Sequence, residues 1–132
     1  MTDGEIKPKV LLIEDNPYDA KLLKIYLEGD GFDIMHAESG HRGIEIMANT
    51  PYAFNAVLLD RVLPDMDGLE TLRALKFAPR GSNVPVIMLT AAISPRQAEE
   101  ALLIGAHACL AKPYNKDEIL ATLNALLKRK RP

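Results

Sequence analysis

The chain has 132 residues, 48% of them hydrophobic and 26% charged, a composition typical of one globular domain with a single core. Its formal net charge is −2 and its pI about 5.9, so no overall positive field favours nucleic acid or an anionic membrane surface. A lone cysteine excludes an intrachain disulfide and a thiolate metal cluster, and the polar start does not read as a signal sequence. We therefore expect a cytoplasmic protein without a membrane contact.

Five apolar segments predict five strands. The runs at 10–13, 56–59 and 86–89 are solidly apolar, which is typical of strands buried on both faces of a sheet. The segment 32–37 alternates imperfectly between apolar and polar residues, which favours a strand near a sheet edge. The segment 108–111 has the weakest strand propensity, but it also ends at a charged residue, and we interpret it as the fifth strand.

Helix signals follow each of these segments. Four expected helices begin after residues that cap helix N-termini: Asn16, Ser39, Ser94 and Asn115. The remaining helix, after 56–59, is indicated by leucines at helical spacing: Leu69, Leu72 and Leu75. Glycines that suit helix C-termini stand at Gly29 and Gly105. The chain therefore alternates strand and helix throughout.

This alternation predicts an α/β fold with a parallel sheet that is covered by helices on both faces. With the 32–37 strand at an edge, the natural strand order is 2-1-3-4-5, which is the flavodoxin-like (βα)5 doubly wound arrangement. We expect one domain over residues 9–129, between a polar leader at 1–8 and a basic tail at 130–132.

Chemically capable residues follow the inner strands of this predicted sheet. They are Glu14 and Asp15 after the first strand, Asp60 after the third, Thr90 after the fourth and Lys112 after the fifth. Because the carboxyl ends of parallel strands meet at one edge, we expect these side chains to lie together. Three clustered carboxylates need compensating positive charge, and their oxygen ligands suit Mg²⁺ or Mn²⁺ better than zinc. Taken alone, Asp60 is equally compatible with an Asx turn that only bonds loop amides.

The ordered set of motifs resembles a response regulator receiver domain from two-component signalling, over nearly the whole chain. The matching features are Glu14-Asp15, Asp60 with Leu63-Pro64-x-Met66-Asp67-Gly68, Thr90-Ala91 and Lys112-Pro113-Tyr114. The resemblance implies that Asp60 accepts a phosphoryl group from the phosphohistidine of a histidine kinase or phosphotransfer protein. Such a chain is a phosphoacceptor rather than an enzyme, although it promotes its own phosphoryl transfer and the hydrolysis of its aspartyl phosphate.

The resemblance also implies a magnesium site. Asp15 and Asp60 would hold Mg²⁺, for which Mn²⁺ can substitute, and Glu14 would help through water. The backbone carbonyl of Val62 would complete the protein ligands. No second ligand stands at metal spacing beside either His36 or His41, so neither is predicted to bind metal.

Further roles are implied for residues after the fourth and fifth strands. The Thr90 hydroxyl, the Ala91 amide and the Lys112 ammonium group would contact the phosphoryl oxygens. The Lys112-Pro113 peptide bond is expected to be cis, as is common in the family. An X-Pro bond can adopt that form at a cost of about 0.5–1 kcal/mol.

Two departures from the family pattern affect what the phosphorylated state does. The position of the aromatic switch partner is occupied by Cys109, so we expect a weaker link between Thr90 and the output face. The positions that tune hydrolysis are the apolar Val62 and Ala92, neither of which can orient an attacking water. The phosphoryl lifetime is therefore left open.

We expect a single-domain regulator, unless the chain is a fragment of a longer protein, because no DNA-binding or catalytic output domain follows the last helix. It would signal through protein contacts on the face of the fourth helix, fifth strand and fifth helix, as a monomer or weak dimer without direct DNA binding. An alternative is a receiver-like adaptor that works without phosphorylation, which Cys109 keeps open. An FMN-binding flavodoxin-like protein is disfavoured because Glu14-Asp15-Asn16 presents negative charge to a phosphate. A haloacid dehalogenase-like phosphatase would need two aspartates one residue apart after the first strand, and the chain lacks them.

Overall fold

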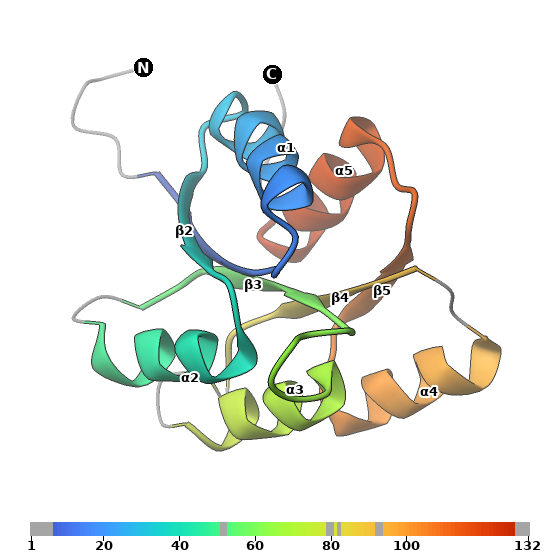
Figure 1. Ribbon diagram of the computed structural model, residues 1–132. Coiled ribbons are helices and arrows are strands. Elements are labelled where there is room, and N and C mark those ends of the chain that lie inside the picture. Colours follow the sequence, from blue (N-terminus) through green and yellow to red (C-terminus); the bar gives the residue numbers. More distant parts are fainter. Residues whose placement is uncertain (1–6, 51–52, 79–80, 82, 92–93, 129–132) are drawn as a thin grey trace.

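A computed structural model describes residues 7–50, 53–78, 81, 83–91 and 94–128, and the predicted basic tail and Ala92 lie outside these ranges. Strands and helices alternate along the chain (Figure 1). The strands are β1 (Lys9–Ile13), β2 (Asp33–Ala37), β3 (Ala56–Asp60), β4 (Val86–Thr90) and β5 (Ala108–Ala111). The helices are α1 (Pro17–Glu28), α2 (Gly40–Asn49), α3 (Gly68–Phe77), α4 (Pro95–Ile104) and α5 (Lys116–Leu126).

The strands form one parallel sheet in the order β2-β1-β3-β4-β5, which confirms the predicted flavodoxin-like arrangement. Helices α1 and α5 cover one face, and α2, α3 and α4 cover the other (Figure 1). Each face has its own apolar cluster, because successive strand residues point to opposite sides of the sheet. Among the described helices, none is long and apolar enough to cross a membrane.

Burial along the strands follows the apolar pattern of the sequence. Every residue of β3 and β4 is buried, and β1 is buried from its second residue onward. Strand β2 lies at an edge, as predicted, and only its second and fifth residues, Ile34 and Ala37, are buried. Strand β5, at the other edge, is only partly buried along its length.

Local capping fixes where the helices begin. Ser94 and Gln97 form the predicted capping box at α4, and Gly105 ends that helix with a positive φ of 133°. The sequence analysis did not identify the cap of α3, which is Asp67: its side chain accepts the Leu69 N–H at 2.8 Å. Gly68 is required at the start of α3, because a Cβ there would lie 2.7 Å from the Arg61 Cα atom.

Candidate functional site

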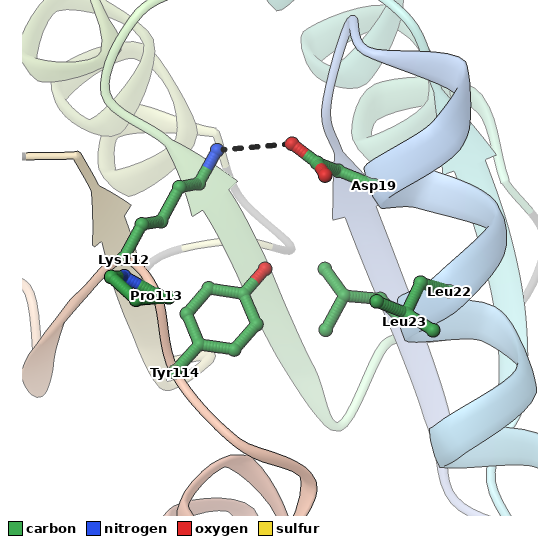
Figure 2. Close-up of a pocket in the computed structure, with 6 residues that line it drawn as sticks. All are labelled: Asp19, Leu22, Leu23, Lys112, Pro113 and Tyr114. Atoms are coloured by element: carbon green, nitrogen blue, oxygen red, sulfur yellow. Dashed lines mark ion pairs between the residues drawn. The ribbon is translucent and has the colours of Figure 1, made fainter.

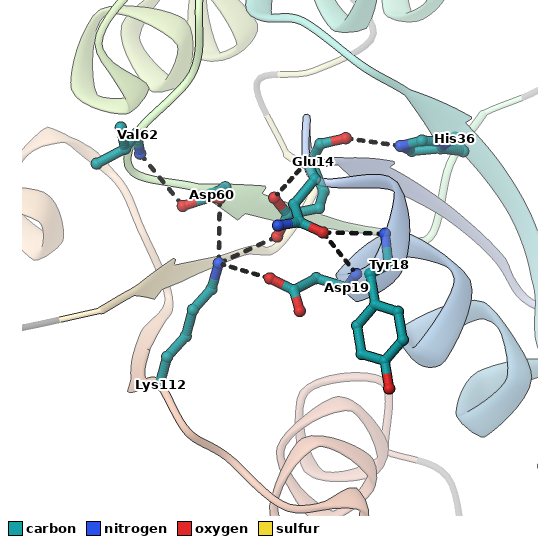
Figure 3. A network of polar contacts seen from close by, with 8 residues as sticks. Glu14, Tyr18, Asp19, His36, Asp60, Val62 and Lys112 are labelled. Atoms are coloured by element: carbon teal, nitrogen blue, oxygen red, sulfur yellow. Dashed lines mark hydrogen bonds and ion pairs between the residues drawn. The ribbon is translucent and has the colours of Figure 1, made fainter.

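Three acids and a lysine meet at the carboxyl edge of the sheet, and Figure 3 shows Glu14, Asp60 and Lys112 of this group. Glu14 and Asp15 directly follow β1, Asp60 is the last residue of β3, and Lys112 directly follows β5. One carboxylate oxygen from each acid lies within 4.8 Å of the other two. The structure therefore brings together the acids that the sequence placed after separate strands.

Lys112 bridges the acids from the β5 side. Its Nζ atom lies 3.1 Å from Oε1 of Glu14 and 3.1 Å from Oδ2 of Asp60. A fourth acid, Asp19 in the first turn of α1, approaches the same nitrogen at 3.8 Å. Burial by itself lowers the pKa of Lys112, but the charges and hydrogen bonds of Asp60 and Glu14 outweigh it and raise that pKa.

Burial and the neighbouring Asp60 both disfavour the ionised form of Glu14. Its side chain is fully buried, and burial together with its hydrogen bond to and repulsion by Asp60 raises the pKa of Glu14 to about 7. The Asn16 N–H and Lys112 lower that pKa only in part. One lysine therefore does not neutralise the cluster, and a purely oxygen donor set with excess negative charge fits a hard divalent cation.

Asp60 makes two different contacts through its two oxygens. Oδ1 accepts the Val62 N–H at 3.2 Å, which is the loop-amide contact considered from the sequence, while Oδ2 pairs with Lys112. The Asp60 residue is 5% exposed, whereas Val62 is 70% exposed on the loop that follows. The carboxylate is thus oriented from both sides at the end of a buried strand.

Thr90 and Ala91 line a cavity on the other side of this loop. Thr90 is buried at the end of β4, and its carbonyl accepts the Lys112 N–H at 2.6 Å. The cavity has a volume of about 440 Å³ and is lined by Arg61, Val62, Leu63, Asp67, Thr90, Ala91 and Gln97. The Lys112-Pro113 peptide bond, expected to be cis, is cis in the structure.

Cys109 is the second residue of β5 and is half-buried against the apolar cluster under α2, α3 and α4. Burial raises the pKa of its thiol, and the charge of Arg61 offsets that rise only partly. The side chain is therefore a small core group at a position where the family pattern places an aromatic ring.

Two contacts of the site were not predicted from the sequence. The His36 ring nitrogen Nε2 lies 2.7 Å from the Glu14 carbonyl oxygen, which ties the edge strand β2 to the acid cluster (Figure 3). Asp19 joins through Lys112, and its place as an acid in the first turn of α1 was the one available signal. The His36 contact has no local sequence signature, because it depends on the register between β1 and β2.

Comparison with known proteins gives a consistent result. The family model described as response regulator receiver domain matches residues 10–124. A curated relative, the transcriptional regulatory protein CpxR homolog of Haemophilus influenzae, is 37% identical over 92% of this chain and 51% of its own length. The chain thus spans about half the length of the curated relatives it matches.

Solved structures agree in fold and sequence. The signal receiver domain of a putative LuxO repressor protein from Vibrio parahaemolyticus has a TM-score of 0.84 and 32% identity, covering 93% of this chain and 92% of that one. The receiver domain of sensor histidine kinase PA1611 from Pseudomonas aeruginosa, which holds a magnesium ion in its active-site cleft, has a TM-score of 0.84 and 27% identity, covering 93% and 99%. The chain belongs to the response regulator receiver domain family.

Proposed function

We propose that this chain is a phosphoacceptor whose Asp60 takes a phosphoryl group from the phosphohistidine of a histidine kinase or phosphotransfer protein. The observation that carries the proposal is the buried Asp60 carboxylate, paired with Lys112 at 3.1 Å inside a cluster of three acids. We take residues 9–129 as the receiver unit. The family match and the fold support this assignment.

In the transfer step, a carboxylate oxygen of Asp60 bonds to phosphorus while the bond from phosphorus to the donor histidine nitrogen breaks. The leaving nitrogen keeps the electron pair of that bond. Lys112 pairs with one phosphoryl oxygen, and the Thr90 hydroxyl and Ala91 N–H donate to another. This division of labour suits phosphoryl transfer, which depends mainly on alignment and on charge placed against the phosphoryl oxygens.

Mg²⁺ is the cofactor we propose, and Mn²⁺ can substitute. Asp15, Asp60 and the Val62 backbone carbonyl would hold it, with Glu14 acting through water. When bound, the ion supplies positive charge that offsets the acids and the incoming phosphoryl group. The fit is supported by the oxygen-only donor set and by the charge of the three acids, which Lys112 alone does not balance.

The phosphodonor would approach over α1 and the segment after β5. A cavity of about 330 Å³ lies beside Lys112, lined by Asp19, Leu22, Leu23, Lys112, Pro113 and Tyr114 (Figure 2). On α1, the helix that supplies Asp19, Leu22 and Leu23 to this cavity, Tyr18 and Ile25 are 78% and 59% exposed. An apolar surface at the rim of a charged site suits a partner that presents one reactive histidine from an amphipathic helix.

Output would pass to a cytoplasmic partner protein through the face of α4, β5 and α5. The Cys109 side chain is smaller than an aromatic ring and makes fewer contacts that could differ between two conformations. We therefore expect phosphorylation to shift the conformation of this face less than in a relative with an aromatic residue at this position. We also propose that the chain promotes hydrolysis of its own aspartyl phosphate. Because Val62 is apolar and cannot orient an attacking water, this hydrolysis should be slow.

Intact-mass measurement after incubation with acetyl phosphate and Mg²⁺ tests the proposal. Wild type should gain one phosphoryl group and Asp60→Asn none, and labelling should disappear when EDTA replaces Mg²⁺. Asp33→Asn, which changes an exposed aspartate on β2, is the matched control and should label like wild type. Equal labelling of wild type and Asp60→Asn contradicts the assignment of Asp60. A wild type that never labels favours the phosphorylation-independent adaptor.

A further inference from the structure

The loop between β3 and α3 reaches across to the start of α2. Oδ1 of Asp65 accepts the Gly40 N–H at 2.9 Å, and Oδ2 accepts the His41 N–H at 2.8 Å. The same Oδ2 atom lies 2.5 Å from Nδ1 of the His41 ring. Burial would raise the pKa of Asp65, but these contacts outweigh it and lower the pKa to about 2. The carboxylate is therefore ionised while it sits on the N-terminus of α2.

Helix α2 depends on this distant carboxylate. Its own first turn contains no acidic residue, and Ser39 accepts only the Arg42 N–H, at 3.1 Å. Asp65 therefore satisfies two of the donors that a helix start leaves without intrahelical partners, and it supplies the negative charge favoured there. Packing is also tight, because a Cβ at Gly40 would lie 2.5 Å from Cγ of Met66. Asp65 and Met66 of the loop therefore pack closely against the start of α2.

The other end of the same loop is closed beside the acceptor. Val62 and Asp67 form an antiparallel bridge, and the Gly68 N–H donates to the Arg61 carbonyl at 2.8 Å. Arg61 also donates through Nε to Oδ1 of Asp67 at 3.2 Å. The base of the loop is thus fixed next to Asp60, which accepts the Val62 N–H. A segment closed at its base and held at its tip moves as one piece.

We propose that Asp65 is a positioning residue for phosphorylation of Asp60. By holding the loop tip on α2, it fixes the Val62 backbone relative to the Asp60 carboxylate. The proposal deepens the phosphoacceptor function and rests on it. Ser39 already caps the start of α2 from within its own segment. The helix therefore does not need a second cap from the loop between β3 and α3.

The test compares Asp65→Ala and Asp65→Asn with Ser39→Ala, which weakens the same helix start without touching the loop. Each variant is assayed for its initial rate of phosphorylation by acetyl phosphate across a Mg²⁺ series, and for thermal unfolding in the same buffer. Ser39→Ala should unfold at a lower temperature than wild type, because it loses a helix cap, and should label within about twofold of the wild-type rate. Asp65→Ala should label about tenfold more slowly, because small misplacements near the reacting atoms are costly in rate.

Asp65→Asn should be labelled at a rate between those of Asp65→Ala and Ser39→Ala, because its amide oxygen still accepts one N–H. His41→Ala keeps both backbone contacts and should fall closer to wild type; with Asp65→Asn it provides the readout if Asp65→Ala does not fold. Equal rates for Asp65→Ala and Ser39→Ala would mean that Asp65 is only a helix cap and would overturn the proposal.

A second readout separates this proposal from the phosphoacceptor function. Amide hydrogen exchange at Val62, measured without a phosphodonor, should be faster in Asp65→Ala than in wild type and unchanged in Ser39→Ala. If wild type is never phosphorylated, the proposed function fails, and Asp65 then positions nothing for transfer. If wild type is phosphorylated but Val62 exchange and the labelling rate do not respond to Asp65, the positioning role alone is wrong.

Discussion

The two halves of the sheet edge differ in how firmly the fold holds them. Glu14 directly follows β1 and is fully buried, and Asp60 ends β3 and is 5% exposed, whereas Asp15 is exposed. The lysine follows β5, a strand that is only partly buried, beside α4, in which Ala101 alone of its ten described residues is fully buried. Regions with few buried contacts open at lower free energy. Glu14 and Asp60 are therefore held by the core, whereas Lys112 follows a strand with fewer buried contacts.

Two leucines, one on β3 and one on β5, allow the stability of the two regions to be compared by the same substitution. Leu58 of β3 and Leu110 of β5 pack against the same apolar cluster, but Leu58 is fully buried and Leu110 only partly. Leu58→Ala should lower the free energy of unfolding by about 3–5 kcal/mol because it leaves a cavity in a closed core. Leu110→Ala should cost roughly 1–2 kcal/mol because part of its side chain is already in water.

Urea unfolding of both variants provides the measurement, with equal m-values required for the comparison. Similar losses in the two variants would mean that β5 is held as firmly as β3. That result would contradict the division of the sheet edge into a rigid half and a pliable half.

The next prediction concerns the pH dependence of stability that arises from the buried Glu14 carboxyl group. Because burial and Asp60 raise the pKa of Glu14 from 4.5 to about 7, folding favours the protonated form of this group. Its contribution is fully present below pH 4.5 and is lost as pH rises through about 7. The metal-free protein should therefore lose on the order of 3 kcal/mol of stability across that window from this group.

Unfolding in urea with EDTA between pH 5 and pH 8 measures the effect. Glu14→Gln should flatten the decline, because the variant has no carboxyl group to ionise. Mg²⁺ at pH 8 should restore stability to wild type, since bound cation favours the ionised acid. The same decline in Glu14→Gln would show that another group is responsible.

Most of the fold was predictable because strands and helix starts have local signatures. The run 56–59 indicated a buried strand, and Ser94 with Gln97 indicated a helix start through bonds between near neighbours. The meeting of Glu14, Asp60 and Lys112 also followed, because the ends of parallel strands meet at one edge. Strand order and residue order alone were sufficient for that inference.

Contacts made by loops could not be predicted in the same way. Asp65 reaches His41 across 24 positions of sequence, and no periodicity or capping pattern links them. His36 meets the Glu14 carbonyl only because β2 pairs with β1 in one particular register. Loop conformation and register are set by tertiary packing, so the anchoring of the acceptor loop became visible only in the structure.

Peptide-resolved hydrogen exchange with and without acetyl phosphate and Mg²⁺ tests the account most directly, in wild type and Asp60→Asn. Before phosphorylation, the account predicts slow exchange in β1 and β3 and faster exchange in α4 and β5. The phosphodonor should then change exchange in α4, β5 and the loop 61–67 of wild type, leave β1 and β3 as they were, and change nothing in Asp60→Asn. Identical changes in both proteins, or changes centred on β1 and β3, would contradict the account.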